Sequence, residues 1–308
     1  MSKSSPPLHV PVLLDHVLEI LHPHPGSIIV DCTVGLGGHA SELLKRIGKK
    51  GRLIGIDFDP ASLERARVRL AEVGPNFILH RGNFAGLPQA LAVAGAGRAD
   101  AVLADLGVSS PQIDDAARGF SYLRDGPLDM RMDPTRGRTA ADLVNTMKEE
   151  ELAEALADLG DETDAPAIAR HVAERRKRAP IRTTRELAEL VCAARRFTWE
   201  RALGAKLHPA ARTFQALRIL VNRELASLER LLTVLPAGLA PGGVAAIISF
   251  HSGEDRRVKA AFRDGLRAGF YSEISPDPIV ADDEERGRNP RSRPAKMRWA
   301  RASRTHES

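Results

Sequence analysis

Residues 30–40 read "VDCTVGLGGHA" and form a glycine-rich loop directly after a short apolar run. Gly35, Gly37 and Ala40 match the G-x-G-x-x-G/A spacing of a turn between a strand and a cofactor-binding helix. Glycine carries no side chain, so backbone N–H groups of such a loop can come close to a ligand. The loop therefore predicts a cofactor with a nucleotide part, and the residues around it must identify that cofactor.

Three acids stand at or near the ends of apolar runs. Asp31, Asp57 and Asp105 each occupy such a position, and Phe84 follows the apolar run at 77–82. Ligands of open parallel sheets bind beyond the carboxyl ends of the strands, so we expect these four side chains to gather around one site. Asp57 lies twenty residues after Gly37, where an acid accepts hydrogen bonds from ribose hydroxyls.

Strands and helices alternate over the first hundred residues. We predict strands at 27–32, 52–57, 77–82 and 99–107, a helix from Gly38 to Gly48, and a second helix after the N-cap Asp59 and Pro60. This order is typical of a parallel sheet with right-handed crossovers, which is an α/β fold. Strand patterns return at 242–250 and in the tail "AKMRWARAS", and both should complete the sheet.

The alternation stops after the fourth strand. Residues 108–208 are rich in charge and mostly helical by pattern, so we predict an inserted helical domain, with the sheet domain formed by 1–107 and 209–308. We expect one long helix in "ARTFQALRILVNRELASLERLL" and an exposed loop at 282–294.

Two cofactors compete for the loop: a dinucleotide and S-adenosylmethionine. Asp57 suits both, since both carry an adenosine ribose. Asp31 discriminates, because a carboxylate before the loop attracts a cationic amino-acid end and repels a pyrophosphate. No histidine with an arginine clamp for hydride transfer is evident. These residues favour S-adenosylmethionine.

The charge distribution points to a polyanionic partner. The net charge is +5, and residues 170–206 hold eleven Lys/Arg against four Asp/Glu, while 286–304 hold eight basic and no acidic residues. A face presented to phosphates explains these blocks, and an ordinary solvated helix surface is the alternative. Two cysteines, no secretory leader and no membrane-length apolar run fit a reducing cytoplasm.

Longer motifs identify a family. The chain contains "VDCTVGLGGHASELL", "GIDFDP", "LADLGVSSPQIDDAARGFSYLRDGPLDMRMDP", "HPAARTFQALRILVNREL", "LAPGGVAAIISFHSGEDRRVK" and "NPRSRPAKMR". From His9 to Arg301 it closely resembles the bacterial small-subunit ribosomal RNA methyltransferase H family, also called MraW. One departure is Gly253, where the family usually has Leu, and this bears on the packing of that turn.

The resemblance implies fold, activity and partners. It implies a class I, Rossmann-like S-adenosylmethionine-dependent methyltransferase sheet carrying the helical insertion as a substrate-recognition domain. It implies methylation of the N4-amino group of a cytidine in the decoding region of 16S rRNA, and it implies 16S rRNA within the assembled small ribosomal subunit as the partner. Monomer and homodimer both stay open, as do naked RNA and the assembled subunit.

The resemblance also carries over the site. The cofactor positions it implies are Gly37, Gly38, His39, Asp57, Phe84, Asp105 and Gln112. His39 could contact the methionine end or only cap its helix, and Phe84 could stack on adenine or belong to the core.

Asp105 is the predicted catalytic residue. The cytosine amino lone pair is delocalised into the ring, and an acceptor bonded to its N–H stabilises the positive charge that grows during methyl transfer. Related amino-methyltransferases have an aromatic residue just after this acid, but here Asp105 is followed by Leu106-Gly107-Val108. Phe120 or Tyr122 could supply the missing ring.

Two further segments have open roles. Residues 118–134 mix arginines with aspartates, as either a lid over the cofactor or an internally salt-bridged loop. His251, after the strand 242–250, is either at the rim of the site or structural. No cluster has metal-ligand spacing, so we expect no metal.

The main alternative to an enzyme is an RNA-binding ribosome assembly factor with a non-catalytic methyltransferase fold. A methyltransferase acting on DNA or protein is a third hypothesis. Transfer of a labelled methyl group to each substrate separates the three.

Overall fold

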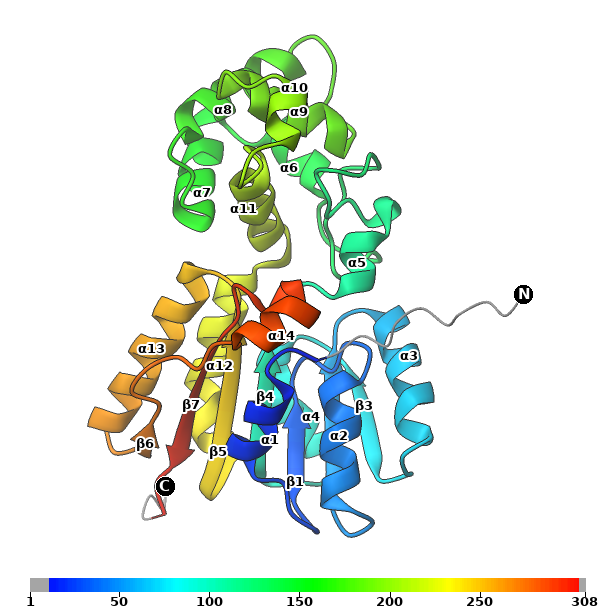
Figure 1. Cartoon of the computed structure of the whole chain (residues 1–308), viewed down its shortest axis with the longest axis vertical. Coiled ribbons are helices and arrows are strands. Elements are labelled where there is room, and N and C mark those ends of the chain that lie inside the picture. The colour runs from blue at the N-terminus through cyan, green and yellow to red at the C-terminus, as the bar shows by residue number, and fades with distance from the viewer. Residues whose placement is uncertain (1–10, 305–308) are drawn as a thin grey trace. The chain divides into compact units, whose positions relative to one another are not determined.

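A computed structural model of the chain describes residues 11–304 (Figure 1). His9 and Val10, where the family resemblance begins, lie outside the described residues, as do the first ten residues of the segment in which we looked for a leader. The chain forms two compact units. The sheet unit combines the residues up to Gly107 with those from Leu225 onward, and the helical unit is Val108–Glu224.

A seven-stranded sheet organises the sheet unit, in the order β3-β2-β1-β4-β5-β7-β6. Its strands are β1 (Ile28–Asp31), β2 (Arg52–Asp57), β3 (Phe77–Arg81), β4 (Ala99–Asp105), β5 (Leu239–Ser249), β6 (Tyr271–Ile274) and β7 (Lys296–Ala302). Strands β1 to β5 pair in parallel, and β7 pairs antiparallel with both β5 and β6. The predicted α/β, Rossmann-like fold is confirmed, and its topological switch point lies between β1 and β4.

Helices cover both faces of this sheet (Figure 1). They are α1 (Leu14–Leu21), α2 (Gly38–Ile47), α3 (Pro60–Ala71), α4 (Leu87–Val93), α12 (Glu224–Gly238), α13 (Ser252–Arg267) and α14 (Asp283–Arg288), with 3-10 turns at Phe84–Gly86 and Pro290–Ser292. Helices α1, α2 and α3 pack on the face that carries Ile29, and α4, α12 and α13 pack on the face that carries Val30. Neighbouring strand residues point to opposite faces, so a strand buried on both sides reads as a continuous apolar run.

Local sequence sets the starts of the two helices nearest the site. Gly37 adopts a left-handed conformation, with φ 76°, directly before α2. The Asp59 side chain accepts a hydrogen bond from the backbone N–H of Ala61, and Pro60 opens α3, as predicted. Both helices therefore begin at the carboxyl ends of β1 and β2.

The helical unit has its own core. Its helices are α5 (Ser110–Asp114), α6 (Ala140–Thr146), α7 (Glu149–Gly160), α8 (Ala165–Arg176), α9 (Thr184–Ala194), α10 (Trp199–Leu203) and α11 (Ala211–Asn222), with a 3-10 turn at Ala116–Arg118. Side chains such as Leu152, Ile168 and Leu217 are fully buried in one apolar cluster. The insertion after the fourth strand is therefore helical, as expected.

The second boundary of the insertion lies further along the chain than the predicted residue 208. Helix α11 belongs to the helical unit, which extends to Glu224. Gly160 at the end of α7 makes this packing close, since a Cβ there would lie 2.5 Å from the carbonyl oxygen of Arg212. The apolar residues of α11 indicate a buried helix face, but their spacing does not indicate which of the two units that face packs in.

Three local predictions were wrong. The long helix expected over 211–232 breaks at Arg223, which has φ 52°, between α11 and α12. The expected exposed loop 282–294 contains α14 and a 3-10 turn, and the buried Glu285 carboxylate there accepts a hydrogen bond from the Leu13 backbone N–H. Strand β6 was not predicted, because its four residues form a short, mostly exposed run at the sheet edge.

Candidate functional site

Three predicted acids end neighbouring parallel strands of the sheet unit. Asp31 ends β1, Asp57 ends β2 and Asp105 ends β4. The loop after β1 is tied to both neighbouring strands, because the Cys32 N–H donates to the Leu103 carbonyl and the Val34 N–H donates to the Ile56 carbonyl. We call Asp31, Asp57 and Asp105, with the loop 32–37 among them, the acid rim.

Asp57 already holds the glycine loop in place. Its Oδ2 accepts a hydrogen bond of 2.8 Å from the Gly35 N–H, and its Oδ1 accepts one of 2.8 Å from the Asp59 N–H. Each carboxylate oxygen accepts more than one hydrogen bond, so both keep capacity for a ligand hydroxyl. Burial raises the pKa of Asp57 to about 6, although these backbone hydrogen bonds lower it.

Asp31 is almost completely buried. Its Oδ1 accepts a hydrogen bond of 3.1 Å from the Thr33 N–H. Burial raises the pKa of Asp31 to about 7, the hydrogen bond from Thr33 acts in the opposite direction, and the charge of Asp57 raises it again. Near neutral pH this carboxyl is thus close to half protonated.

Asp105 has an unsatisfied buried oxygen. Its Oδ1 is buried and finds no hydrogen-bond partner within residues 11–304. Its backbone N–H donates to the Thr33 hydroxyl at 2.6 Å, which fixes the end of β4 to the glycine loop. Burial raises the pKa of Asp105 well above its ordinary value, and the charges of Asp31 and Glu254 raise it further. An unpaired buried acceptor is costly, so a ligand that donates a hydrogen bond to this oxygen would stabilise the site.

His39 faces Asp105 from α2. Its Nε2 lies 2.8 Å from the Val12 carbonyl oxygen, which can only accept, so Nε2 carries a proton. Its Nδ1 lies 3.7 Å from Asp105 Oδ2. No side-chain hydrogen bond caps the start of α2, so His39 does not serve as its cap. The Nδ1 edge of the ring instead faces the Asp105 carboxyl.

The two adjacent glycines serve different purposes. Gly37 takes the left-handed backbone that turns the chain from the loop into α2. At Gly38 a Cβ would lie only 2.8 Å from Cγ of Pro11. Gly38 therefore lets the segment at Pro11 and Val12 pack directly on the start of α2, where Val12 also holds His39.

Phe84 and Gln112 lie in different units. Phe84 begins the 3-10 turn after β3, is half-buried and packs against the sheet core. Gln112 belongs to the helical unit, where it is buried and its Oε1 accepts a hydrogen bond of 2.9 Å from the Ser109 N–H. That bond forms a capping box at the start of α5. Cofactor contacts of these two residues stay predictions.

Glu254 is a site residue that sequence reasoning missed. It is buried in the first turn of α13, its Oε2 accepts a hydrogen bond of 2.8 Å from the Phe250 N–H, and its charge raises the pKa of Asp105. His251, predicted as either a rim or a structural residue, has its Nε2 3.3 Å from Glu254 Oε1. The acid-rich helix start after "SFHSG" was the available signal. At Gly253 a Cβ would lie 3.1 Å from Nδ1 of His251, so a larger residue there would require the His251 ring to shift slightly.

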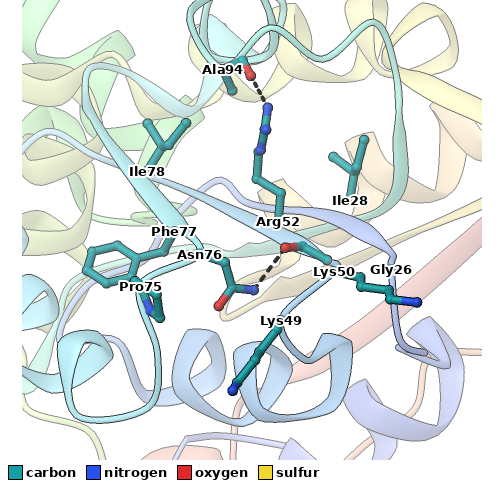
Figure 2. A pocket seen from close by; sticks show the side chains of 11 residues that line it. Gly26, Ile28, Lys49, Lys50, Arg52, Pro75, Asn76, Phe77, Ile78 and Ala94 are labelled. Atoms are coloured by element: carbon teal, nitrogen blue, oxygen red, sulfur yellow. Dashed lines mark hydrogen bonds between the residues drawn. The ribbon is translucent and has the colours of Figure 1, made fainter.

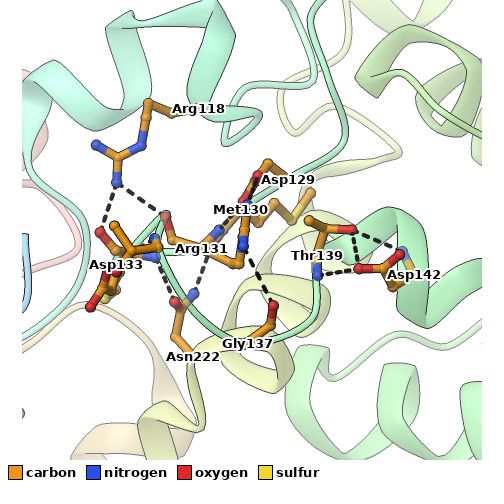
Figure 3. Close-up of polar contacts among 11 residues, drawn as sticks. Arg118, Asp129, Met130, Arg131, Asp133, Gly137, Thr139, Asp142 and Asn222 are labelled. Carbon is orange, nitrogen blue, oxygen red and sulfur yellow. Dashed lines mark hydrogen bonds and ion pairs between the residues drawn. The ribbon is translucent and has the colours of Figure 1, made fainter.

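Residues 118–134 form a closely hydrogen-bonded segment within the helical unit (Figure 3). The Arg118 guanidinium donates to the carbonyls of Arg131 and Met132, and Arg131 pairs with Asp129 at 2.7 Å. The Asn222 side chain donates to the Met130 carbonyl and accepts from the Met132 N–H, which holds Met130 at φ 64°. This agrees with the internally bonded alternative, and a lid function stays a prediction.

The two aromatic candidates of this segment pack within the helical unit. Phe120 is buried in its core, and Tyr122 stacks on His208 with ring centroids 4.7 Å apart. Both rings therefore have partners in their own unit.

A separate cavity of about 660 Å³ lies at the opposite ends of the strands (Figure 2). Ile28 and Arg52, which line it, begin β1 and β2, whereas the acid rim follows the last residues of these strands. Asn76 donates to the Gly48 and Gly51 carbonyls there, and Arg52 donates to the Ala94 carbonyl. This cavity is distinct from the acid rim.

The acid rim fits a cationic ligand. Among the described residues, no lysine or arginine nitrogen lies within 4 Å of the carboxylates of Asp31, Asp57 or Asp105. Buried carboxylates without a cation are unstable when ionised, so a ligand that brings positive charge and N–H or O–H donors complements them. No group of three or more potential metal-ligating side chains occurs in residues 11–304. None of the helices described there is long and apolar enough to cross a membrane.

Comparison with known proteins gives the family. The model of the MraW methylase family matches residues 7–303. The chain belongs to this family. The predicted cofactor is thereby confirmed, since the methyl donor of these methylases is S-adenosylmethionine.

Members of the MraW family from several bacteria are similar over nearly their whole length. "Ribosomal RNA small subunit methyltransferase H" of Geobacter sulfurreducens is 45% identical, with 95% of this chain and 98% of that protein covered. The protein of the same name from Koribacter versatilis is 44% identical, with 95% and 93% covered. A solved structure of a putative rRNA methylase from Clostridium thermocellum is 10% identical, with 94% of each chain covered and a TM-score of 0.45.

Proposed function

We propose that this methylase transfers a methyl group from S-adenosylmethionine to the N4-amino group of a cytidine in the decoding region of 16S rRNA. The unpaired buried Oδ1 of Asp105 at the end of β4 carries the proposal. Relatives named as ribosomal RNA small subunit methyltransferases support the substrate class. The N4 position and the decoding region rest on the motif resemblance.

Asp57, Gly37 and Gly38 would bind the donor. The Asp57 oxygens would accept hydrogen bonds from the ribose hydroxyls while they keep their bonds to the Gly35 and Asp59 N–H groups. Gly37 and Gly38 leave the start of α2 free of Cβ atoms where the loop turns. Phe84 would lie against the adenine face, and the motif resemblance carries over Gln112 as a further contact of the donor. When bound, S-adenosylmethionine supplies an electrophilic methyl group on a sulfonium centre.

Asp105 would act on the cytosine amine. Its Oδ1 would accept a hydrogen bond from one N–H of the amine, which draws the nitrogen lone pair out of conjugation and stabilises the charge that develops on nitrogen. As N4 bonds to the methyl carbon, the bond from that carbon to the donor sulfur would break, and the methylated nitrogen would then lose its N–H proton to the ionised Asp105 carboxylate. Only the ionised carboxyl is a full acceptor, yet burial and the charges of Asp31 and Glu254 favour its protonated form. His39 Nδ1, 3.7 Å away, offers a place for that proton. His39 is thus proposed as a positioning residue that keeps Asp105 ionised during transfer.

Alignment provides the remaining rate. A bound donor and an extruded base face each other in one site, and effective molarities for aligned reactants are large. Cytosine N4 is engaged in a base pair within duplex RNA, so the target must be unpaired or flipped out. We propose that the helical unit binds the rRNA, that the small ribosomal subunit is the physiological substrate, and that the protein acts in the cytoplasm.

Nucleoside analysis tests the activity. Small subunits isolated from a strain that lacks this gene are incubated with the protein and methyl-labelled donor, and the rRNA is digested for mass spectrometry. We expect label in N4-methylated cytidine from a decoding-region fragment. RNA binding without methyl transfer would favour the non-catalytic assembly factor. Label found only in DNA or protein would show that the substrate is not RNA.

A further inference from the structure

Two arginine–aromatic pairs and two exposed leucines lie in or just after helices α9 and α10 of the helical unit, whose ribbons Figure 1 shows. We call this group the aromatic–arginine surface, and its residues are Arg185, Phe197, Trp199, Arg201, Leu203 and Leu207. Leu203 is 55% exposed and Leu207 is 58% exposed, although both are large apolar residues. The apolar core of the helical unit does not account for these exposed side chains.

Two guanidinium groups lie over aromatic rings in this surface. The Arg185 Cζ is 3.9 Å from the centroid of the Trp199 ring, and the Arg201 Cζ is 5.3 Å from the centroid of Phe197. An arginine held over an aromatic ring loses little freedom when it binds an anion, and its N–H edges point outward. Each pair therefore combines a π surface with a preorganised phosphate-binding group.

The rings are anchored from below. Trp199 is half-buried and meets His208 edge-on with ring centroids 5.4 Å apart, and His208 stacks on Tyr122 at 4.7 Å. His208 itself is buried. Trp199 is therefore fixed in orientation by the core of its own unit while part of it stays accessible.

The charge of this region is not balanced. Residues 195–212 contain five basic side chains and one acidic side chain. In the described part of the chain, no carboxylate lies within 4 Å of Arg196, Arg201 or Lys206. Arg185 has only a distant contact, 4.0 Å, with Glu189. The surface is thus cationic as well as aromatic.

We propose that the aromatic–arginine surface binds unpaired nucleotides of the RNA substrate, with bases on the rings and leucines and phosphates on the arginines. Unpaired bases present apolar faces that stack on aromatic side chains whatever their sequence, and uncompensated cations attract phosphates. A protein partner would have to bring acidic groups between its apolar side chains, whereas RNA supplies both features along one strand. This inference rests on the proposed function, because it takes RNA as the substrate.

Fluorescence of Trp199 tests the surface directly. The chain has two tryptophans, so Trp299→Phe leaves Trp199 as the single emitter. We would titrate this protein with a twelve-nucleotide single-stranded oligocytidylate and with an RNA duplex of the same length. We expect saturable quenching by the single strand and weaker quenching by the duplex.

An arginine pair of variants separates stacking from bulk charge. Arg201→Ala, made in the Trp299→Phe background, should weaken single-strand binding about fivefold or more, since a lost stacking contact has an effect of that order. Arg170→Ala removes the same charge from an exposed position on α8 and should weaken binding less. Circular dichroism spectra of all variants should match that of the parent.

Several results of these measurements would refute the proposed RNA-binding surface. Unchanged Trp199 emission, or equal losses for Arg201→Ala and Arg170→Ala, would overturn the surface. So would a protein ligand whose binding depends on Arg201 when RNA binding does not. Methyl transfer to small subunits is measured on the same samples: transfer without quenching refutes the surface alone, and quenching without transfer refutes the methylation alone.

Discussion

Binding of the methyl donor should be coupled to loss of protons from the acid rim. Asp31 has a pKa of about 7 and Asp57 of about 6 when no cation is present. A sulfonium and an ammonium group favour the ionised carboxylates, so only protein that has lost these protons binds the donor tightly. Affinity should therefore rise with pH across the range in which both groups titrate.

The magnitude follows from the two pKa values. Between pH 6 and pH 7.5 the ionised fraction of Asp31 rises about eightfold, and that of Asp57 about twofold. Donor affinity should therefore increase roughly fifteenfold, or by about 1.6 kcal/mol. The pKa of Asp105 is also raised by burial, so this carboxyl should add to the proton release when the donor binds.

The folding stability of the donor-free protein should change with pH in the opposite direction to donor affinity. The folded pKa of Asp31 lies above its ordinary value of 3.8, so the folded state keeps a proton that the unfolded chain has already lost. The stability from this group is fully present below pH 4 and disappears as the pH rises toward 7. Donor-free protein should lose stability over the range in which donor affinity grows.

Isothermal titration calorimetry in two buffers of different ionisation enthalpy measures affinity and proton release together. Asp31→Asn is the matched variant, because its amide oxygen can still accept from the Thr33 N–H. It should lose most of the pH dependence and retain the twofold part due to Asp57. An affinity that stays constant from pH 6 to 7.5, with no proton released, would refute protonated rim carboxyls next to the donor.

Three further variants test individual residues. Asp57→Ala should weaken donor binding by about 1–3 kcal/mol, because it leaves ribose hydroxyls and the Gly35 and Asp59 N–H groups without their acceptor, and an unchanged calorimetric affinity would contradict this. Asp105→Asn should reduce kcat far more than RNA affinity, and equal losses would remove Asp105 from the chemistry. Gly38→Ala should lower the free energy of unfolding by about 1–3 kcal/mol, because its Cβ would lie 2.8 Å from Cγ of Pro11. Thermal melting at fixed pH measures this loss. Gly48→Ala is the comparison variant, since a Cβ there meets nothing within 4 Å and its cost comes only from the backbone angle φ of +61°.

The acid rim could be predicted from sequence because the position of each acid depends on the residues next to it in the chain. Each acid follows an apolar run that is buried on both faces, and parallel strands bring their carboxyl ends to one edge of the sheet. The position of Asp31 next to β4 follows from that topology alone, since Asp31 pairs with Leu103. Glycine spacing and strand ends were sufficient to predict where Asp57 and Asp105 lie.

What could not be predicted depends on contacts between distant parts of the chain. The buried carboxylate of Glu285 accepts a hydrogen bond from the Leu13 N–H, 272 positions away in the chain. Because the local sequence does not show this partner, we predicted that the segment 282–294 is an exposed polar loop. Glu254 looked like any acid at a helix start, although its charge acts on Asp105. The turn at Arg223 ends a helix without glycine or proline. Charge and periodicity alone do not reveal such long-range partners.

The acid rim also bears on how the methylase releases its product. Methyl transfer removes the sulfonium charge from the cofactor, so, if the acid rim holds the donor as proposed, the carboxylates of Asp31 and Asp105 then face one cationic group fewer. Ionised buried carboxylates regain stability by taking up a proton when a neighbouring cation is lost, which weakens their hold on what is left. A rim built from lysine–carboxylate pairs would not respond in this way, because its charges would already be balanced. Because no such pair lies around these acids within residues 11–304, we expect the site to prefer the sulfonium donor over the product, which has lost the sulfonium charge but keeps its ammonium group.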